Sequence, residues 1–173
     1  MGKSLCAVLL LLSLCGCSAI YVDPGQTPAT LRVHALATLD PAWVDDMLQY
    51  RLLSVEEYLK AKWNGSLEGP WWAIKAYQRG ADGQLTPLRP LIGGLFAGVT
   101  TYNFSGSRDF IIPMGNYQVE IWLTAYMYYC SGFSWDTCAT PTLRIWKEGL
   151  DINQFASGQL YEAYVGQQLG GKD

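Results

Sequence analysis

Histidine is almost absent from this sequence, because His34 is the only one in 173 residues. His34 would therefore have to serve as the general base of any Ser–His or Cys–His pair, and a lone histidine on a strand is usually a satisfied boundary residue. The sequence has no Gly-x-Ser-x-Gly elbow, phosphate-binding loop or His-x-x-Glu-His motif. The neighbouring carboxylates Asp45-Asp46 and Glu56-Glu57 diverge on a helix or a strand, so neither pair forms an acid/base couple. We expect no enzyme activity, no catalytic residues and no cofactor.

Positive charge is also scarce, with 12 Lys and Arg against 15 Asp and Glu and a formal net charge of −3. Binding to nucleic acid needs a basic face, so no nucleic-acid partner is expected. The chain has no internal repeat and no low-complexity tract. Its length suits one domain with a sizeable core.

The N-terminus has the pattern of a secretory signal. Lys3 supplies the positive region, and Leu5 to Leu14 form an apolar stretch of about ten residues. Such a stretch is too short to span a bilayer. The pattern predicts export from the cytoplasm.

The string 14-LCGC-17 resembles the lipobox of bacterial lipoproteins. Gly16 is the small residue before Cys17, whereas Cys15 follows Leu14 and is a poorer candidate. The resemblance implies cleavage after Gly16, a diacylglyceryl thioether on Cys17 and a fatty acyl group such as palmitate on its amino group. Several acyl chains hold a protein to a membrane durably. The alternative is a plain cleaved signal with an incidental cysteine.

Ser18 follows the cysteine, and no Asp stands there to retain the protein at the inner membrane. By the lipoprotein rule this implies the periplasmic face of the outer membrane. The mature chain would then run from Cys17 to Asp173. Loss of Lys3 would leave 11 basic residues against 15 acidic ones.

Two of the five cysteines lie beyond the lipobox, Cys130 and Cys138. In an oxidising periplasm we expect them to form a disulfide. The alternative is two buried thiols. Zinc is a poor fit, since only His34 could join them and zinc takes four ligands.

Alternating apolar residues predict a mainly β fold of many short strands, a transthyretin- or immunoglobulin-like β-sandwich with one short added helix. The expected domains are a signal at 1–16, a tether at 17–29, the sandwich at 30–157 and a polar tail at 158–173, loose or helical. The expected strands are 30–39, 47–53, 71–78, 84–89, 95–104, 109–112, 117–128, 142–147 and 152–155. Turns are expected at 81–84, 105–107 and 148–149.

One helix is expected at 55–63. Ser54 and Glu57 have capping-box spacing, and Asn64-Gly65 is a good stop. Helical spacing places four apolar residues on one face: Val55, Tyr58, Leu59 and Trp63. The preceding segment is ambiguous, because Asp40 could cap a helix with Pro41 at its first position. We favour a strand at 47–53.

The strand at 117–128 has large residues on both faces. Alternate residues from Tyr117 to Met127 would fill the core, and the opposite face carries Trp122, Tyr126 and Tyr128. Trp71, adjacent to Trp72 but on the other face of its strand, adds a fourth aromatic. Exposed aromatic residues are binding anchors for proteins or sugar rings. The alternative is that a helix or the 130–138 loop covers this face.

Several segments resemble the type VI secretion outer-membrane lipoprotein family. They are 31-LRVHALATLDP-41, 47-MLQYRLLSVEEYLKAKW-63 and 116-NYQVEIWLTAYMY-128. Ile111-x-Pro-x-Gly-x-Tyr117-x-Val is also similar to the turn and strand of transthyretin-like domains. Residues 71–90 and 130–138 have no counterpart in the family.

The resemblance implies a non-catalytic anchor that binds the periplasmic end of an inner-membrane component and ties it to the outer membrane. In the family, the loop between the first two strands contributes to that contact. Here the loop spans about 38–46 and contains Asp40, Pro41 and Trp43. The alternative interpretation of this loop is a solvated connection without a binding role. Two other functions stay open: an immunity or inhibitor lipoprotein that occludes a toxin, and a glycan-binding module.

Overall fold

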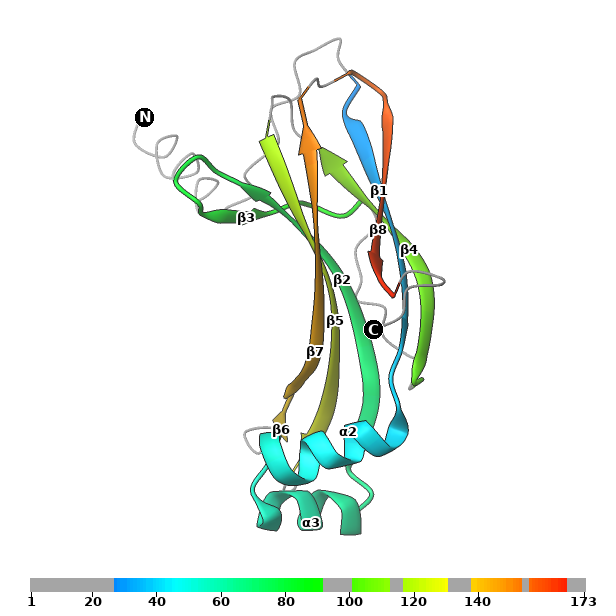
Figure 1. Ribbon diagram of the computed structural model, residues 1–173, viewed down its shortest axis with the longest axis vertical. Coiled ribbons are helices and arrows are strands. Elements are labelled where there is room, and N and C mark those ends of the chain that lie inside the picture. The colour runs from blue at the N-terminus through cyan, green and yellow to red at the C-terminus, as the bar shows by residue number, and fades with distance from the viewer. Residues whose placement is uncertain (1–26, 92–100, 113–116, 131–137, 154–155, 168–173) are drawn as a thin grey trace, which may run out of the picture.

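The computed structural model describes residues 27–91, 101–112, 117–130, 138–153 and 156–167 (Figure 1). This part of the chain is mainly β and forms two sheets, so the predicted β-sandwich is confirmed. Its strands are β1 (Ala29–Thr38), β2 (Leu67–Arg79), β3 (Leu85–Pro87), β4 (Asn103–Ile112), β5 (Tyr117–Cys130), β6 (Cys138–Ala139), β7 (Thr142–Ile152) and β8 (Leu160–Gly166). The helical segments are α2 (Pro41–Met47), the π-helical turn η1 (Leu48–Leu52) and α3 (Val55–Trp63). The predicted signal, most of the tether and Cys17 lie outside the described residues.

The two sheets differ in length. The smaller has the order β4-β1-β8, and the larger contains β3, β2, β5 and β6, with β7 also paired to β5. In Figure 1 the long curved strands β2, β5 and β7 run the length of the molecule, and α2 and α3 lie at one end of them. Strand β1 begins near the opposite end and runs toward α2. The chain thus leads from one end of the sandwich to the helices at the other.

The core lies between the sheets and follows the predicted alternation. The inward residues of β1 are buried: Leu31, Val33, Ala35 and Ala37, followed by Leu39. Those of β5 are Val119, Ile121, Leu123, Ala125 and Met127. The period-two burial confirms both predicted strands and their faces. The hairpin of β2 with β3 around residues 81–84 is confirmed as well.

The predicted strand at 47–53 is wrong, because this segment is helical. The Asp40 side chain accepts a hydrogen bond from the Ala42 amide at 2.9 Å. Pro41 occupies the first helical turn, where its missing N–H costs nothing. The Asp40 cap and Pro41 favour a helix, and they outweigh the alternation at Leu48, Tyr50 and Leu52, which favours a strand. The connection at 38–46 is therefore mostly the helix α2 rather than a loop.

Helix α3 is confirmed, together with its capping box. The Glu57 amide donates to Ser54 Oγ at 3.2 Å, and the Ser54 amide donates to Glu57 Oε2 at 3.0 Å. The buried face differs from the predicted one, since Tyr58 and Ala61 are the buried residues. The small Ala61 fits against the molecule, which turns the larger apolar residues Val55, Leu59 and Trp63 outward.

Two predicted turns are interior residues of long strands. Gly106, in the expected turn at 105–107, pairs with Ala35 inside β4. Gly149, in the expected turn at 148–149, pairs with Glu120 inside β7. Glycine weakens a strand interior, but the residues on both sides of Gly106 and of Gly149 keep their ladder partners. The first part of the expected strand 95–104 lies outside the described residues.

The expected C-terminal tail contains a strand, which is a correction to the predicted domain boundary. Residues 160–166 form β8, parallel to β1, with Val165 buried. Tyr161 and Ala163, which alternate with exposed residues, pack against the core. The polar Gln/Gly-rich composition around 160–166 obscured this period-two pattern.

Candidate functional site

Four of the seven predicted partner-binding residues lie together on the outer face of the long sheet. In the antiparallel register of β2 and β5, Trp71 lies opposite Tyr126 and Lys75 lies opposite Trp122. Because alternate residues of a strand share one face, Tyr128 lies on the same side as Trp122 and Tyr126. We call this surface the aromatic face: Trp71, Tyr77, Trp122, Tyr126 and Tyr128. Trp72 points into the core, as the adjacent-tryptophan argument predicted.

Trp122 forms the most connected part of the aromatic face. Its Nε1 donates to Glu120 Oε1 at 2.6 Å, and its ring centroid lies 4.9 Å from that of Tyr77. The Lys147 ammonium lies 4.2 Å from the Trp122 ring centroid, within cation–π distance. Since these neighbours already occupy the ring, Trp122 is poorly placed as a free stacking platform for a sugar.

Glu120 is held as a carboxylate beneath these side chains. The hydrogen bond from Trp122 is the main cause that lowers the pKa of Glu120, and the hydrogen bond from Arg79 adds to it. Lys147 Nζ lies 3.8 Å from Glu120 Oε1. Arg79 and Lys147 therefore compensate the charge of the Glu120 carboxylate, and the cations outnumber it.

Among the described residues, two polar atoms near the centre of the aromatic face have no hydrogen-bond partner. They are Trp71 Nε1 and Thr124 Oγ1, and both are buried. Each unsatisfied buried group costs on the order of 1–3 kcal/mol. The aromatic rings around them are half-buried rather than fully exposed. The surface is therefore apolar and closely packed, with two unsatisfied polar atoms beneath it.

The remaining three candidates lie at the start of α2, at the end of the sandwich. Asp40 and Pro41 are exposed at the helix start, where Asp40 acts as the cap. Trp43 is partly buried and packs against the core. The structure therefore does not bring these three residues together with the aromatic face, and gives Asp40 and Trp43 structural roles.

The predicted disulfide is confirmed between Cys130, at the end of β5, and Cys138 in β6. The two residues are opposite each other in the antiparallel register. Ser66 Oγ donates a hydrogen bond to the backbone carbonyl of Cys130 at 2.8 Å. The disulfide therefore lies near the chain segment that leads from α3 into β2. Residues 131–137, which it encloses, lie outside the described residues.

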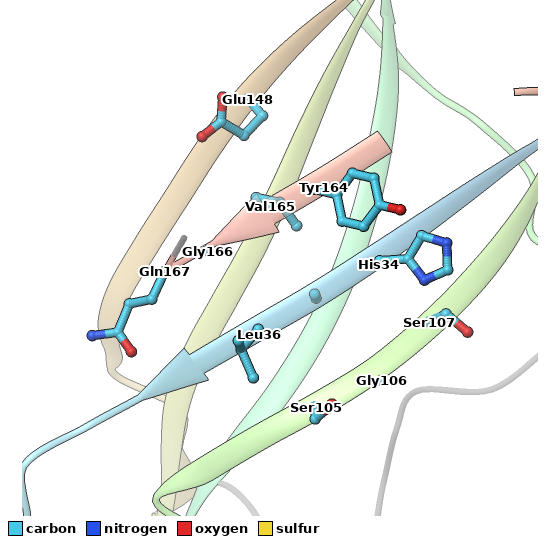
Figure 2. A pocket seen from close by; sticks show the side chains of 11 residues that line it. His34, Leu36, Ser105, Gly106, Ser107, Glu148, Tyr164, Val165, Gly166 and Gln167 are labelled. Carbon is cyan, nitrogen blue, oxygen red and sulfur yellow. The ribbon is translucent and has the colours of Figure 1, made fainter. Parts of the chain in front are cut away.

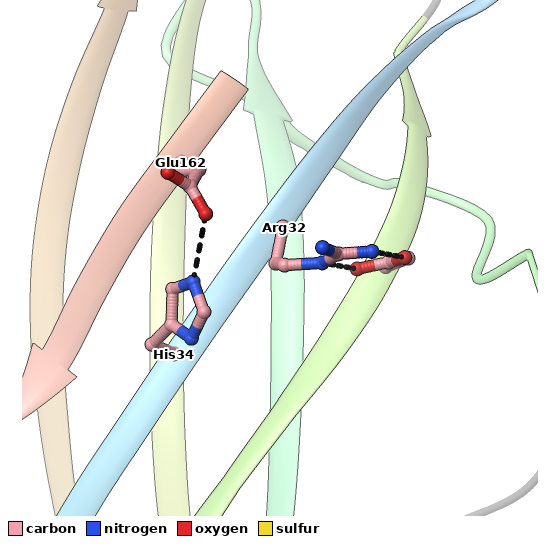
Figure 3. A network of polar contacts seen from close by, with 4 residues as sticks. Arg32, His34 and Glu162 are labelled. Carbon is pink, nitrogen blue, oxygen red and sulfur yellow. Dashed lines mark hydrogen bonds and ion pairs between the residues drawn. The ribbon is translucent and has the colours of Figure 1, made fainter. Parts of the chain in front are cut away.

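The outer face of the smaller sheet carries a polar group of residues that the sequence did not reveal. His34 Nε2 lies 3.1 Å from Glu162 Oε1 (Figure 3). The His34 ring stacks on Tyr164 with centroids 4.9 Å apart. Arg32 donates two hydrogen bonds to Asp109, at 2.9 and 2.8 Å. His34 is thus a partnered boundary residue, as expected. Its partners Glu162 and Tyr164 lie in β8, within the segment for which the sequence predicts a polar tail.

A pocket of about 810 Å³ lies beside these residues, around the end of β8 (Figure 2). His34, Leu36 and Tyr164 contribute side chains from β1 and β8, and Ser105 and Ser107 do so from β4. The described residues include no cluster of His, Cys, Asp and Glu that could hold a metal ion. We assign no ligand to this pocket.

The Arg32–Asp109 pair predicts a small pH effect on stability. The hydrogen bond from Arg32 lowers the pKa of Asp109 below its ordinary value of 3.8. A lowered folded-state pKa gives stability that is present above the unfolded-state pKa and is lost as the pH falls through the folded-state pKa. We expect Asp109→Asn to reduce the urea midpoint at pH 7 and to reduce it less at pH 3. An equal reduction at both pH values would contradict this.

Comparison with family models, curated proteins and solved structures finds no match to this chain. Among the described residues, the helices are all too short or too polar to cross a membrane.

Proposed function

We propose that this chain is a lipid-anchored, non-catalytic protein of the bacterial envelope that binds a protein partner through the aromatic face. In this proposal Cys17 carries the acyl chains and holds the protein at the periplasmic side of the outer membrane. The partner is the periplasmic part of a secretion-type complex. The chain thus ties that complex to the outer membrane.

The observation that carries the proposal is the position of the aromatic face. The smaller sheet packs on the opposite, inward side of the long sheet, and α2 and α3 lie at its end in Figure 1. In the described part of the chain, no helix therefore lies over Trp71, Trp122 and Tyr126. Buried aromatic anchors dominate the binding energy of many interfaces, and their rings contribute large areas at low entropic cost. A half-buried aromatic surface with cations at its margin fits this role.

Charge at the margin adds a preference for an acidic or polar rim on the partner. Lys75 lies opposite Trp122 on one side and Lys147 lies opposite it on the other. Both lysines are exposed. Charges at an interface rim affect association rate and specificity more than final affinity. We therefore place the apolar contact at Trp71 and Tyr126 and the charged rim at the two lysines on either side of Trp122.

Site-specific photocrosslinking in cells tests the proposal. A benzophenone amino acid in place of Tyr126 is expected to give one discrete crosslinked species with an envelope protein. The same amino acid in place of Tyr164 is the matched control, because Tyr164 is a tyrosine on the other sheet and is 70% exposed. Equal crosslinking from both positions, or none from position 126, would refute binding through the aromatic face.

A further inference from the structure

Helix α3 carries an apolar stripe that faces away from the molecule. Val55 is 63% exposed, Leu59 is 55% exposed and Trp63 is 91% exposed. Residues four apart on a helix are neighbours on one face, so the three side chains form a continuous row. Tyr58 and Ala61 anchor the opposite side of the helix. Within the described part of the chain the stripe is thus an uncovered helix face. Helix α3 lies at the end of the sandwich (Figure 1).

The stripe is symmetric about its middle residue. Val55 precedes Leu59 by four positions and Trp63 follows it by four. The charges beside the stripe are not uniform, because the first turn is acidic and the last turn is basic. Glu56 and Lys60 share one flank and form an ion pair at 2.6 Å. An antiparallel copy of the same helix would therefore present the opposite order of charge along that flank.

We propose that the occupant of this stripe is the α3 stripe of a second copy of the chain. A two-fold axis beside Leu59 then brings the two Leu59 side chains together and places Val55 against the partner's Trp63. The same axis places Glu56 beside the partner's Lys60, and Lys60 beside the partner's Glu56. The apolar row and the Glu56–Lys60 flank are each self-complementary, as a two-fold contact requires. This inference is independent of the aromatic face.

The contact is small, which sets its expected strength. A large aromatic side chain such as Trp63 buries roughly 150–250 Å². Stable interfaces bury about 800 Å² per partner. One face of a nine-residue helix provides less than this. The dimer is therefore a weak one whose population depends on protein concentration. Anchoring of both copies in one membrane would raise that concentration.

Cysteine crosslinking of the full-length chain in detergent tests the geometry. Leu59→Cys is expected to form a disulfide-linked dimer on mild oxidation, because residue 59 meets its own copy. Val55→Cys alone is expected not to do so. In the antiparallel pair its two copies are displaced by about eight residues, or ~12 Å along the helix, which exceeds the Cα separation of a disulfide. A mixture of Val55→Cys and Trp63→Cys chains is expected to give the crossed dimer.

The parent chain is the control for the native cysteines, and circular dichroism checks that each variant folds. A failure of Leu59→Cys to crosslink would overturn the proposal. Val55→Cys crosslinking as well as Leu59→Cys would overturn it too, because it would indicate unspecific adhesion or a parallel arrangement.

A charge swap tests the flank separately. Glu56→Lys and Lys60→Glu each place like charges across the two-fold axis and are expected to weaken dimerisation roughly tenfold in sedimentation equilibrium. The double variant restores opposite charges and is expected to recover dimerisation. A double variant as weak as either single variant would contradict the antiparallel pairing.

Discussion

Replacement of Cys17 by serine is expected to abolish incorporation of labelled palmitate and recovery of the protein in the outer-membrane fraction. The reason is chemical, because in the proposed lipoprotein the acyl chains attach through the thiol and the amino group of Cys17. Each buried methylene contributes about 0.8 kcal/mol to membrane binding, so loss of several chains removes the anchor entirely. Metabolic labelling and membrane fractionation measure both effects.

The matched control is Cys15→Ser, two positions earlier in the same string. This variant keeps Gly16 and Cys17 and is expected to be labelled and localised normally. Palmitate labelling that survives in Cys17→Ser, or that disappears only in Cys15→Ser, would contradict the assignment. No labelling in the parent chain would favour a plain cleaved signal.

Trp72→Ala is expected to lower the free energy of unfolding by roughly 3–5 kcal/mol. Trp72 is 2% exposed and is stacked between Phe104 of β4 and Trp146 of β7, with ring centroids 5.4 and 5.7 Å away. Its Nε1 also donates to the Thr101 carbonyl at 2.8 Å. The substitution leaves a cavity between the sheets and an unpaired carbonyl. Because a domain is stable by about 5–15 kcal/mol in total, the variant is expected to be close to unfolding.

Urea titration followed by circular dichroism measures this loss. Trp63→Ala is the control, since the same side chain is removed from a position that is 91% exposed. At low protein concentration this control is expected to change stability by less than about 0.5 kcal/mol. A loss below about 1 kcal/mol in Trp72→Ala would show that Trp72 does not hold the two sheets together.

Strong periodicity made part of the fold predictable. In β1 and β5 every second residue is apolar over ten residues or more, and both strands have the predicted buried face. Ser54 and Glu57 identified α3 because a capping box is a local interaction that needs no tertiary context. The same alternation in β5 placed Trp122, Tyr126 and Tyr128 on one outer face.

The misassigned segments depended on partners distant in the sequence. Residues 160–166 became a strand by pairing with β1, about 130 positions earlier. Gly106 and Gly149 look like turn residues locally, but the neighbouring strands hold them in extended ladders. At 47–53 the local pattern itself suited two structures, and the Asp40 cap decided the outcome. Single-sequence reasoning lacks these long-range contacts.

The candidate site was predictable only in part for the same reason. Strand alternation placed Trp71 and Trp122 on outer faces, but only the register of β2 with β5 shows that Trp71 meets Tyr126. The stripe on α3 was predicted as a row but was expected to include the buried Tyr58. Which side of an amphipathic helix is buried depends on the surface that it meets, and Ala61 gave too weak a signal.

The identity of the species crosslinked from position 126 tests the central proposal most directly. The measurement is photocrosslinking in intact cells, followed by purification of the adduct and mass spectrometry of the attached protein. Binding through the aromatic face predicts a periplasmic segment of an inner-membrane secretion component, absent when the crosslinker is at position 164. An attached toxin or hydrolase would contradict the anchor function and support the immunity alternative, and no attached protein at all would contradict partner binding by this face.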